Sequence, residues 1–206
     1  MTILDYKPDA AAGIDAFIDS NSPTTNYGTN TNIGMGEAYG YSWGVYRSLI
    51  KFTCLSDGTI PSGAIIDSGS IFLRKYGDFS NNARTLRAYR VKRAWTEAGV
   101  TWNKYDGVND WQTAGATGAN DIEATDVGNV SVPATGDGDW IEIPLTASAV
   151  QEIVAGTWTN NGYLLKVDTE ADDYWGYGSS DWADDTYRPR IYVVYHVDDV
   201  RRSFII

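Results

Sequence analysis

Short apolar runs, separated by clusters of Gly, Asn, Asp and Ser, recur along the whole chain. This spacing is typical of many short β-strands joined by turns. Two of the runs, Arg47–Phe52 and Ile71–Tyr76, are partly continuous, as strands inside a sandwich would be. The pattern predicts strands at Ile14–Ile18, Asn32–Gly36, Arg47–Thr53, Ala64–Lys75, Thr85–Lys92, Trp140–Pro144, Gly162–Val167, Tyr174–Gly178 and Arg190–His196.

One segment has the periodicity of a helix. Leu145–Val154 carries apolar residues at positions 149, 150, 153 and 154, with Thr146 as an N-cap candidate and Gly156 as a stop. Residues 104–139 are rich in Gly, Thr and Asp, and this composition predicts long loops. Together the elements predict an all-β protein, a jelly-roll-type β-sandwich with one short helix.

The segment Trp95–Asn103 combines two tryptophans with a Gly turn and a β-prone Val-Thr-Trp run. A large aromatic side chain buries about 150–250 Å², so this segment is expected to organise a β core. Glu97, which lies between the two tryptophans, is expected to make a structural hydrogen bond to a neighbouring turn.

Charge and composition narrow the function classes. The net charge of the 206 residues is −11, and no basic run exceeds two residues. Nucleic-acid binding requires clustered positive charge and is therefore excluded. No apolar run approaches the roughly 18–20 residues of a membrane helix, and the first eight residues have no signal-peptide pattern. Cys54 is the only cysteine, so no intrachain disulfide is expected, and a buried position in a strand is predicted for it.

A series of motifs keeps a defined order over residues 12–195: Asp15–Ile18, Asn26–Gly28, Arg47–Phe52, Ile60–Ser68, Ala88–Val91, Trp95–Asn103, Asn160–Leu165 and Arg188–Tyr195. The series resembles the DNRLRE domain, a β-sandwich family similar to carbohydrate-binding modules and found in secreted and surface proteins. The resemblance implies a jelly-roll fold without catalytic machinery and, in some relatives, polysaccharide binding. It assigns no ligand site to particular residues.

Catalytic signals are weak. His196, the only histidine, stands at the end of the last predicted strand, and the chain has no Gly-x-Ser-x-Gly motif. Paired carboxylates, which could hydrolyse glycosides, are expected by accident among 27 acidic residues. The chain is therefore not expected to be an enzyme.

Acidic loops supply the candidates for a structural calcium ion, the one cofactor considered. Calcium requires six to eight oxygen ligands, and the first candidates are Asp168, Asp172 and Asp173, with Glu170 nearby. Asp181, Asp184 and Asp185 form a second cluster, and Asp137 and Asp139 a third. None has EF-hand spacing, and a solvated turn is the alternative for each cluster.

Two aromatic groups are candidates for stacking on a glycan. The first is Tyr39, Tyr41, Trp43 and Tyr46, and the alternation at 39, 41 and 43 places three rings on one face of an extended segment. The second consists of Tyr174, Trp175, Tyr177 and Trp182. If these faces point outward they form binding strips, and if they point inward they form core. Both alternatives remain open.

The chain ends carry a separate signal. Residues 1–11 and 196–206 flank the domain at 12–195, and the last three residues are apolar. An exposed apolar tail is unfavourable, so both ends are predicted to dock on a neighbouring subunit. The alternative is that the tail folds back on its own sheet. The docking candidates are Leu4, Tyr6, Phe204, Ile205 and Ile206.

Two functions are therefore expected. The first is a non-enzymatic structural subunit of a phage or virus particle, a capsid-decorating or tail protein made in the host cytoplasm and displayed on the virion surface. Its partners would be other capsid or tail subunits. The second is a carbohydrate-binding module that adheres to polysaccharide or host glycan at an extracellular or cell-surface location. Neither involves nucleic acid or a membrane.

Overall fold

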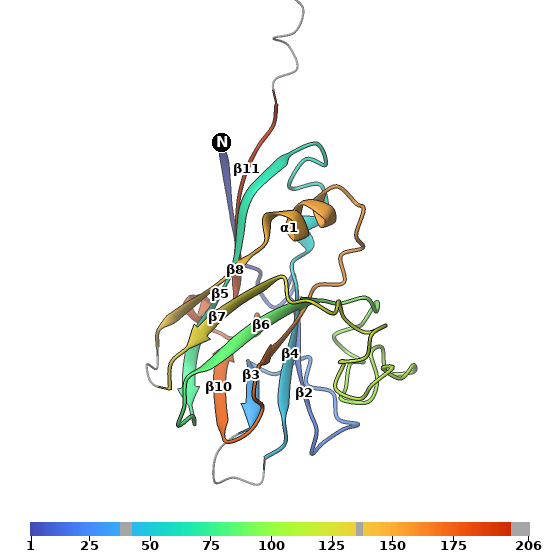
Figure 1. Cartoon of the computed structure of the whole chain (residues 1–206), viewed down its shortest axis with the longest axis vertical. Helices are drawn as coiled ribbons and strands as arrows, with labels where there is room; N and C mark the ends of the chain where they lie inside the picture. The colour runs from blue at the N-terminus through green and yellow to red at the C-terminus, as the bar shows by residue number, and fades with distance from the viewer. Residues whose placement is uncertain (38–42, 135–137, 199–206) are drawn as a thin grey trace, which may run out of the picture.

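The computed structural model describes residues 1–37, 43–134 and 138–198 (Figure 1). The elements are β1 (Thr2–Tyr6), β2 (Ile14–Asp19), β3 (Asn32–Glu37), β4 (Tyr46–Lys51), η1 (Thr53–Leu55), β5 (Ile65–Asp78), β6 (Arg84–Arg90), β7 (Gly128–Val132), β8 (Trp140–Leu145), α1 (Ala147–Val154), β9 (Tyr163–Val167), β10 (Asp173–Gly178), η2 (Asp185–Tyr187) and β11 (Arg190–His196). The described residues are therefore all-β with one short α-helix, as the sequence pattern predicts.

Eight of the strands form a closed ring. They pair in the order β5-β10-β3-β4-β9-β6-β7-β8, and β8 pairs back to β5. Closure depends on the length of β5, which has 14 residues. One edge of β5 pairs with β8, and the other edge pairs first with β11 and then with β10. The predicted jelly-roll sandwich is thus corrected to a closed β-barrel with additional strands.

Three strands lie outside the ring. β2 pairs with β4, β11 pairs with the first half of β5, and β1 pairs with β11 over five residue pairs. The start of β5, the end of β11 and β1 extend together beyond the barrel, past α1 (Figure 1). Thr2–Tyr6, within the expected docking arm, therefore forms a strand of the chain's own sheet.

The main core fills the barrel. Its pattern is clearest in β8, where Ile141, Ile143 and Leu145 are buried and the residues between them are exposed. Alternation of this kind is the signature of a strand with one buried face. α1 covers one end of the barrel and contributes Val150 and Ile153 to the same core.

A second core lies under the 91–122 loops and contains Trp95, Trp111, Leu49 and Leu164. The indole nitrogen of Trp95 donates a 2.7 Å hydrogen bond to the Asn161 carbonyl. The prediction that the Trp95–Asn103 segment organises a β core is confirmed.

The nine predicted strands correspond to β2–β6 and β8–β11, whereas β1 and β7 were not predicted. β7 lies within the region that was predicted to be loop. It was missed because its sequence, Gly-Asn-Val-Ser-Val, has only two large apolar residues. Cys54 is buried as expected but lies in η1 rather than in a strand. No helix in the described part of the chain is long and apolar enough to cross a membrane.

Candidate functional site

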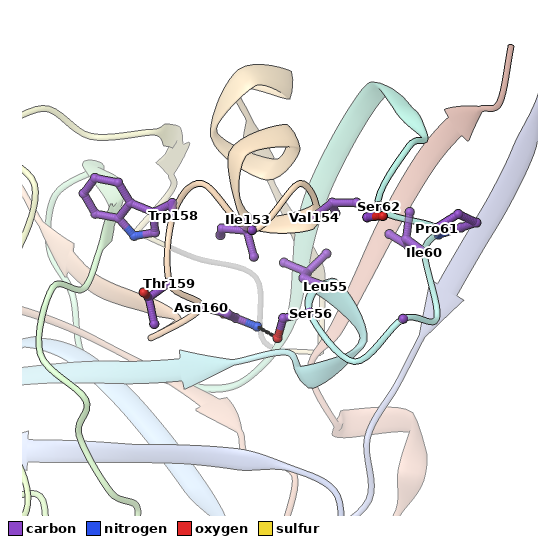
Figure 2. Close-up of a pocket in the computed structure, with 12 residues that line it drawn as sticks. Leu55, Ser56, Ile60, Pro61, Ser62, Ile153, Val154, Trp158, Thr159 and Asn160 are labelled. Carbon is purple, nitrogen blue, oxygen red and sulfur yellow. Dashed lines mark hydrogen bonds between the residues drawn. The ribbon is translucent and has the colours of Figure 1, made fainter.

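A cavity of about 520 Å³ opens between the end of α1 and the segment that joins η1 to β5. Figure 2 shows Trp158 and Thr159 at one end of this cavity and Ile60, Pro61 and Ser62 at the other. The aliphatic side chains of Leu55, Ile153 and Val154 lie between the two ends. We call it the α1 cavity. Its volume lies within the range of small-molecule sites, about 300–1,000 Å³.

The end of α1 shapes one wall of the cavity. Gly156 has a φ of +75°, a left-handed conformation that side chains disfavour. Its amide donates to the Ile153 carbonyl, and the amide of Thr157 donates to the Glu152 carbonyl. This pair of hydrogen bonds is the Schellman motif that ends many helices. It turns the chain so that Trp158 follows within one turn of the helix end.

Asn160 joins the two walls. Its side-chain amide donates 2.9 Å hydrogen bonds to the Phe52 carbonyl and to the Ser56 hydroxyl, the second of which Figure 2 draws. The amide oxygen accepts from the backbone of Gly162. Because Asn160 is buried and engages the Ser56 hydroxyl, it holds the cavity in shape, and the hydroxyls of Ser62 and Thr159 are the ones placed to meet a ligand.

Trp158 is positioned by a buried arginine. The guanidinium carbon of Arg90 lies 3.9 Å from the centroid of the indole ring. Arg90 is held by Glu123 through two hydrogen bonds and by Glu152 through one of 2.6 Å. Burial alone would lower the pKa of Arg90, but the hydrogen bonds to Glu123 and Glu152 outweigh it and raise the pKa. The permanent charge keeps the indole ring in place by a cation–π contact.

The α1 cavity is uncharged. The twelve described residues that line it include serine, threonine and asparagine but no acidic or basic side chain. Trp158 and Thr159 also border a smaller cavity of about 210 Å³, whose lining includes the charged Lys92. The arrangement therefore favours a neutral ligand with both hydroxyl and apolar groups.

The first predicted aromatic group is only partly described. Tyr39 and Tyr41 lie outside the described residues. Trp43 is half-buried, and its ring makes edge contacts with Phe79 and Tyr174 at centroid distances of 5.4 and 5.6 Å. Trp43 is thus part of an aromatic cluster on the barrel.

The second predicted group does not form one surface. Tyr174 and Trp175 are buried, and Trp175 donates a 3.0 Å hydrogen bond to the Pro133 carbonyl. Trp182 is half-buried and stacks on Tyr187 at a centroid distance of 5.0 Å. Tyr174 and Trp175 are buried because they belong to β10, a strand of the ring whose two faces are both covered.

The predicted calcium ligands are not brought together. Among the described residues no three His, Cys, Asp or Glu side chains form a group that could hold a metal. Asp173 accepts hydrogen bonds from Arg84 and from the Asn81 and Asn82 amides, and Asp168 accepts from the amides of Thr85 and Thr169. Asp172 is exposed in a left-handed turn conformation.

Of the terminal docking candidates, two lie among the described residues and three do not. Leu4 and Tyr6 lie in β1, half-buried against the main core. Phe204, Ile205 and Ile206 lie outside the described residues. His196 is hydrogen-bonded to Asp67 at 3.1 Å on an exposed part of the sheet.

A further aromatic surface, which the sequence did not reveal, lies on the outer side of β5, β8 and β11. The guanidinium carbon of Arg190 lies 4.9 Å from the ring centroids of both Phe72 and Trp140. Trp140 is 39% exposed, the largest exposure of any described tryptophan.

Trp158 of the α1 cavity was not predicted as a site residue either. Its only sequence signal was its position just after the helix stop at Gly156.

Glu97 has the structural role that was expected, with a different partner. Its carboxylate accepts a 2.8 Å hydrogen bond from the amide of Asp15, in β2 rather than in a turn. Burial raises the pKa of Asp15 to about 7 and also raises the pKa of Glu97. Neither carboxyl lines the α1 cavity.

Comparison with family models identifies the domain. The disaggregatase related repeat domain matches residues 15–193, from β2 into β11. The chain belongs to the disaggregatase related repeat family. This match corrects the DNRLRE resemblance, which rested on scaffold motifs such as Asp15–Ile18, because strand and turn requirements recur across β families. Curated proteins give no match to the chain. In this disaggregatase related repeat domain, β1 lies outside the matched range.

Proposed function

We propose that this domain is a non-catalytic glycan-binding module, which holds a neutral sugar unit in the α1 cavity. The observation that carries the proposal is the lining of the cavity. An indole ring, an aliphatic centre and a rim of hydroxyls meet there without a charged side chain. Sugars combine apolar C–H faces with hydroxyl groups, and sites for them combine aromatic faces with a few placed polar groups.

The aliphatic centre narrows the class of sugar. Leu55, Ile153 and Val154 offer no hydrogen bond to a hydroxyl that would lie against them. A buried hydroxyl without a partner is costly, whereas a methyl group gains about 0.8 kcal/mol per buried carbon. The preferred unit therefore carries an acetyl or methyl group, as N-acetylated and deoxy sugars do.

The absence of a proton acceptor supports binding rather than hydrolysis. The hydroxyls of Ser56, Ser62 and Thr159 share the cavity with no His, Asp, Glu or Lys among the described lining residues. A serine nucleophile needs an adjacent base. The proposal agrees with a module that works outside the cell on polysaccharide.

The alternative function, a structural subunit of a phage or virus particle, stays a prediction. It was based on the chain ends, and the apolar tail Phe204–Ile206 lies outside the described residues. The capsid or tail partners expected for it are likewise untested.

The proposal is tested by glycan-array binding and calorimetry on four variants. Trp158→Ala removes the ring, and Ser62→Phe fills the cavity from its exposed rim. Trp140→Ala and Ser131→Phe are matched controls at exposed positions outside the cavity. We expect the first pair to lower affinity at least tenfold and the second pair to leave it unchanged. Loss of binding only in the control pair, or no binding to any neutral glycan, would overturn the proposal.

A further inference from the structure

The outer edge of β1 is unpaired in the described part of the chain. β1 stands at the end of the strand order, with β11 as its single neighbour. Apart from the ladder with β11, no backbone hydrogen bond from the described residues reaches Thr2–Tyr6. Such an edge presents a row of amide and carbonyl groups that can pair with another strand.

The edge also lacks several of the features by which proteins block such pairing, although it contains the charged Asp5, which accepts a hydrogen bond from Arg190. Edge strands are usually protected by lysine, by proline or by a bulge. Thr2–Tyr6 contains neither residue, and its register with β11 runs without a shift. Lys7 and Pro8 come only after the strand ends. The strand is therefore competent to pair along its whole length.

Exposed apolar side chains gather at this part of the molecule. Seven large hydrophobic residues are exposed among the described positions, and four of them are Met1, Ile3, Ile65 and Val197. Ile3 is 58% exposed. These residues lie just before β1 and within it, at the start of β5 and just after β11, in the part that extends beyond the barrel (Figure 1). A contact that covers them would remove apolar surface from water.

We propose that two copies of this chain join edge to edge through β1, antiparallel about a two-fold axis. In a continuous antiparallel sheet, residues that lie opposite each other have side chains on the same face. In a symmetric pair of β1 strands, one residue must therefore lie opposite its own copy, and the two-fold axis passes between the two. With the axis at Ile3, this residue meets the Ile3 of the second copy, and Asp5 lies opposite a Met1. With the axis at Leu4, Ile3 would lie opposite an aspartate. The exposed isoleucine therefore selects the first register.

The second copy is favoured over an unrelated strand by two observations. Pairing at Ile3 places no like charges opposite each other, although β1 contains Asp5. The extension of β1 beyond the barrel leaves room for the second barrel (Figure 1).

Because each chain carries a net charge of −11, repulsion between the two chains opposes the pairing. Salt screens such repulsion over about 10 Å at 0.1 M and about 3 Å at 1 M, so the dimer strengthens with salt.

Cross-linking tests the register. Opposite strand residues have Cα atoms about 4.5–5.5 Å apart, within the range that a disulfide spans. We expect Ile3→Cys to form a disulfide-linked dimer with oxidised glutathione. Asp5→Cys, on the same strand face, is the matched control, and the wild type, whose thiol is the buried Cys54, is the second. Cross-linking of Ile3→Cys no greater than that of Asp5→Cys would overturn the proposal.

Sedimentation of the full chain tests the association itself. We expect a monomer–dimer equilibrium that shifts to dimer as salt is raised. Ile3→Lys should abolish it, whereas Val108→Lys, at an exposed apolar position elsewhere, should not. A wild type that stays monomeric at high salt, or an Ile3→Lys variant that still dimerises, would contradict the proposal. The inference is independent of the α1 cavity, and Ile3→Lys should bind glycan as the wild type does.

Discussion

The amide of Asp15 donates a 2.8 Å hydrogen bond to the carboxylate of Glu97, 82 positions later in the chain. This bond ties the start of β2 to the segment that carries Trp95. The Asp15 side chain is almost fully buried, and its Oδ1 atom has no hydrogen-bond partner among the described residues. Its Oδ2 atom accepts from the amide of Ser180. Three distant segments therefore meet at Asp15, one through its backbone amide and one through its buried carboxyl group.

This geometry predicts a distinct pH dependence of stability. Burial, with smaller contributions from Glu97 and Asp181, raises the pKa of Asp15 from 3.8 to about 7. The folded state then binds the proton more tightly than the unfolded state. The stabilisation is fully present below about pH 4 and is lost as the pH rises through about 7. At 1.36 kcal/mol per pKa unit, the loss is on the order of 4 kcal/mol.

Asp15→Asn tests this prediction, because the amide has no charge to bury. We expect the variant to exceed the wild type in free energy of unfolding at pH 8, with the difference shrinking at pH 5. Urea titrations at both values measure it. The difference between the two proteins is the useful quantity, because the lowered pKa of Asp173 changes total stability in the opposite direction. A difference that does not vary with pH would contradict the prediction.

Two glycines separate backbone strain from steric crowding. Gly156 and Gly162 have similar φ values of +75° and +73°. A Cβ on Gly156 would meet nothing within 4 Å, whereas a Cβ on Gly162 would collide with the Ile50 carbonyl oxygen. Gly156→Ala should cost only the left-handed strain, roughly 1–2 kcal/mol. Gly162→Ala should cost clearly more, as measured by thermal or urea unfolding. Equal losses would show that the crowding at Gly162 is relieved by movement of the strand.

Arg90→Lys tests how Trp158 is held. Lysine keeps the positive charge but lacks the planar fork that bonds Glu123 twice and stacks on the indole ring. We expect a loss of about 2–3 kcal/mol in unfolding free energy, because the buried cation keeps fewer of its hydrogen bonds to Glu123 and Glu152. Glycan affinity should also fall, since the ring at the end of the α1 cavity loses its support. Arg87→Lys, at the more exposed pair with Asp126, is the control and should change little. An Arg90→Lys variant as stable as the control would refute the assigned role.

The local pattern of the chain was sufficient for much of the fold. The strand pattern in Trp140–Pro144 and the Gly156 stop identified β8 and the end of α1, because each depends on neighbours within a few residues. β1 and β7 were missed for the same reason. Their few apolar residues give no local signal, and they become strands by pairing with β11, β6 and β8.

The candidate site could not be predicted in the same way. Asn160 reaches the Phe52 carbonyl across 108 positions, so the α1 cavity exists only where two distant segments meet. The aromatic groups show the same limit. The sequence left the orientation of Trp175 open, and its burial was decided by the place of β10 in the ring.

By itself, the sequence determined the strand-rich class, the short helix and the core-forming role of Trp95. Each follows from periodicity or from the preference of large apolar groups to leave water. The tertiary structure alone decided that β5 closes a barrel with β8 and β10, which rings face inward, and that β1 keeps an open edge. Those outcomes depend on long-range strand pairing, in which a residue's partner is set by the path of the whole chain.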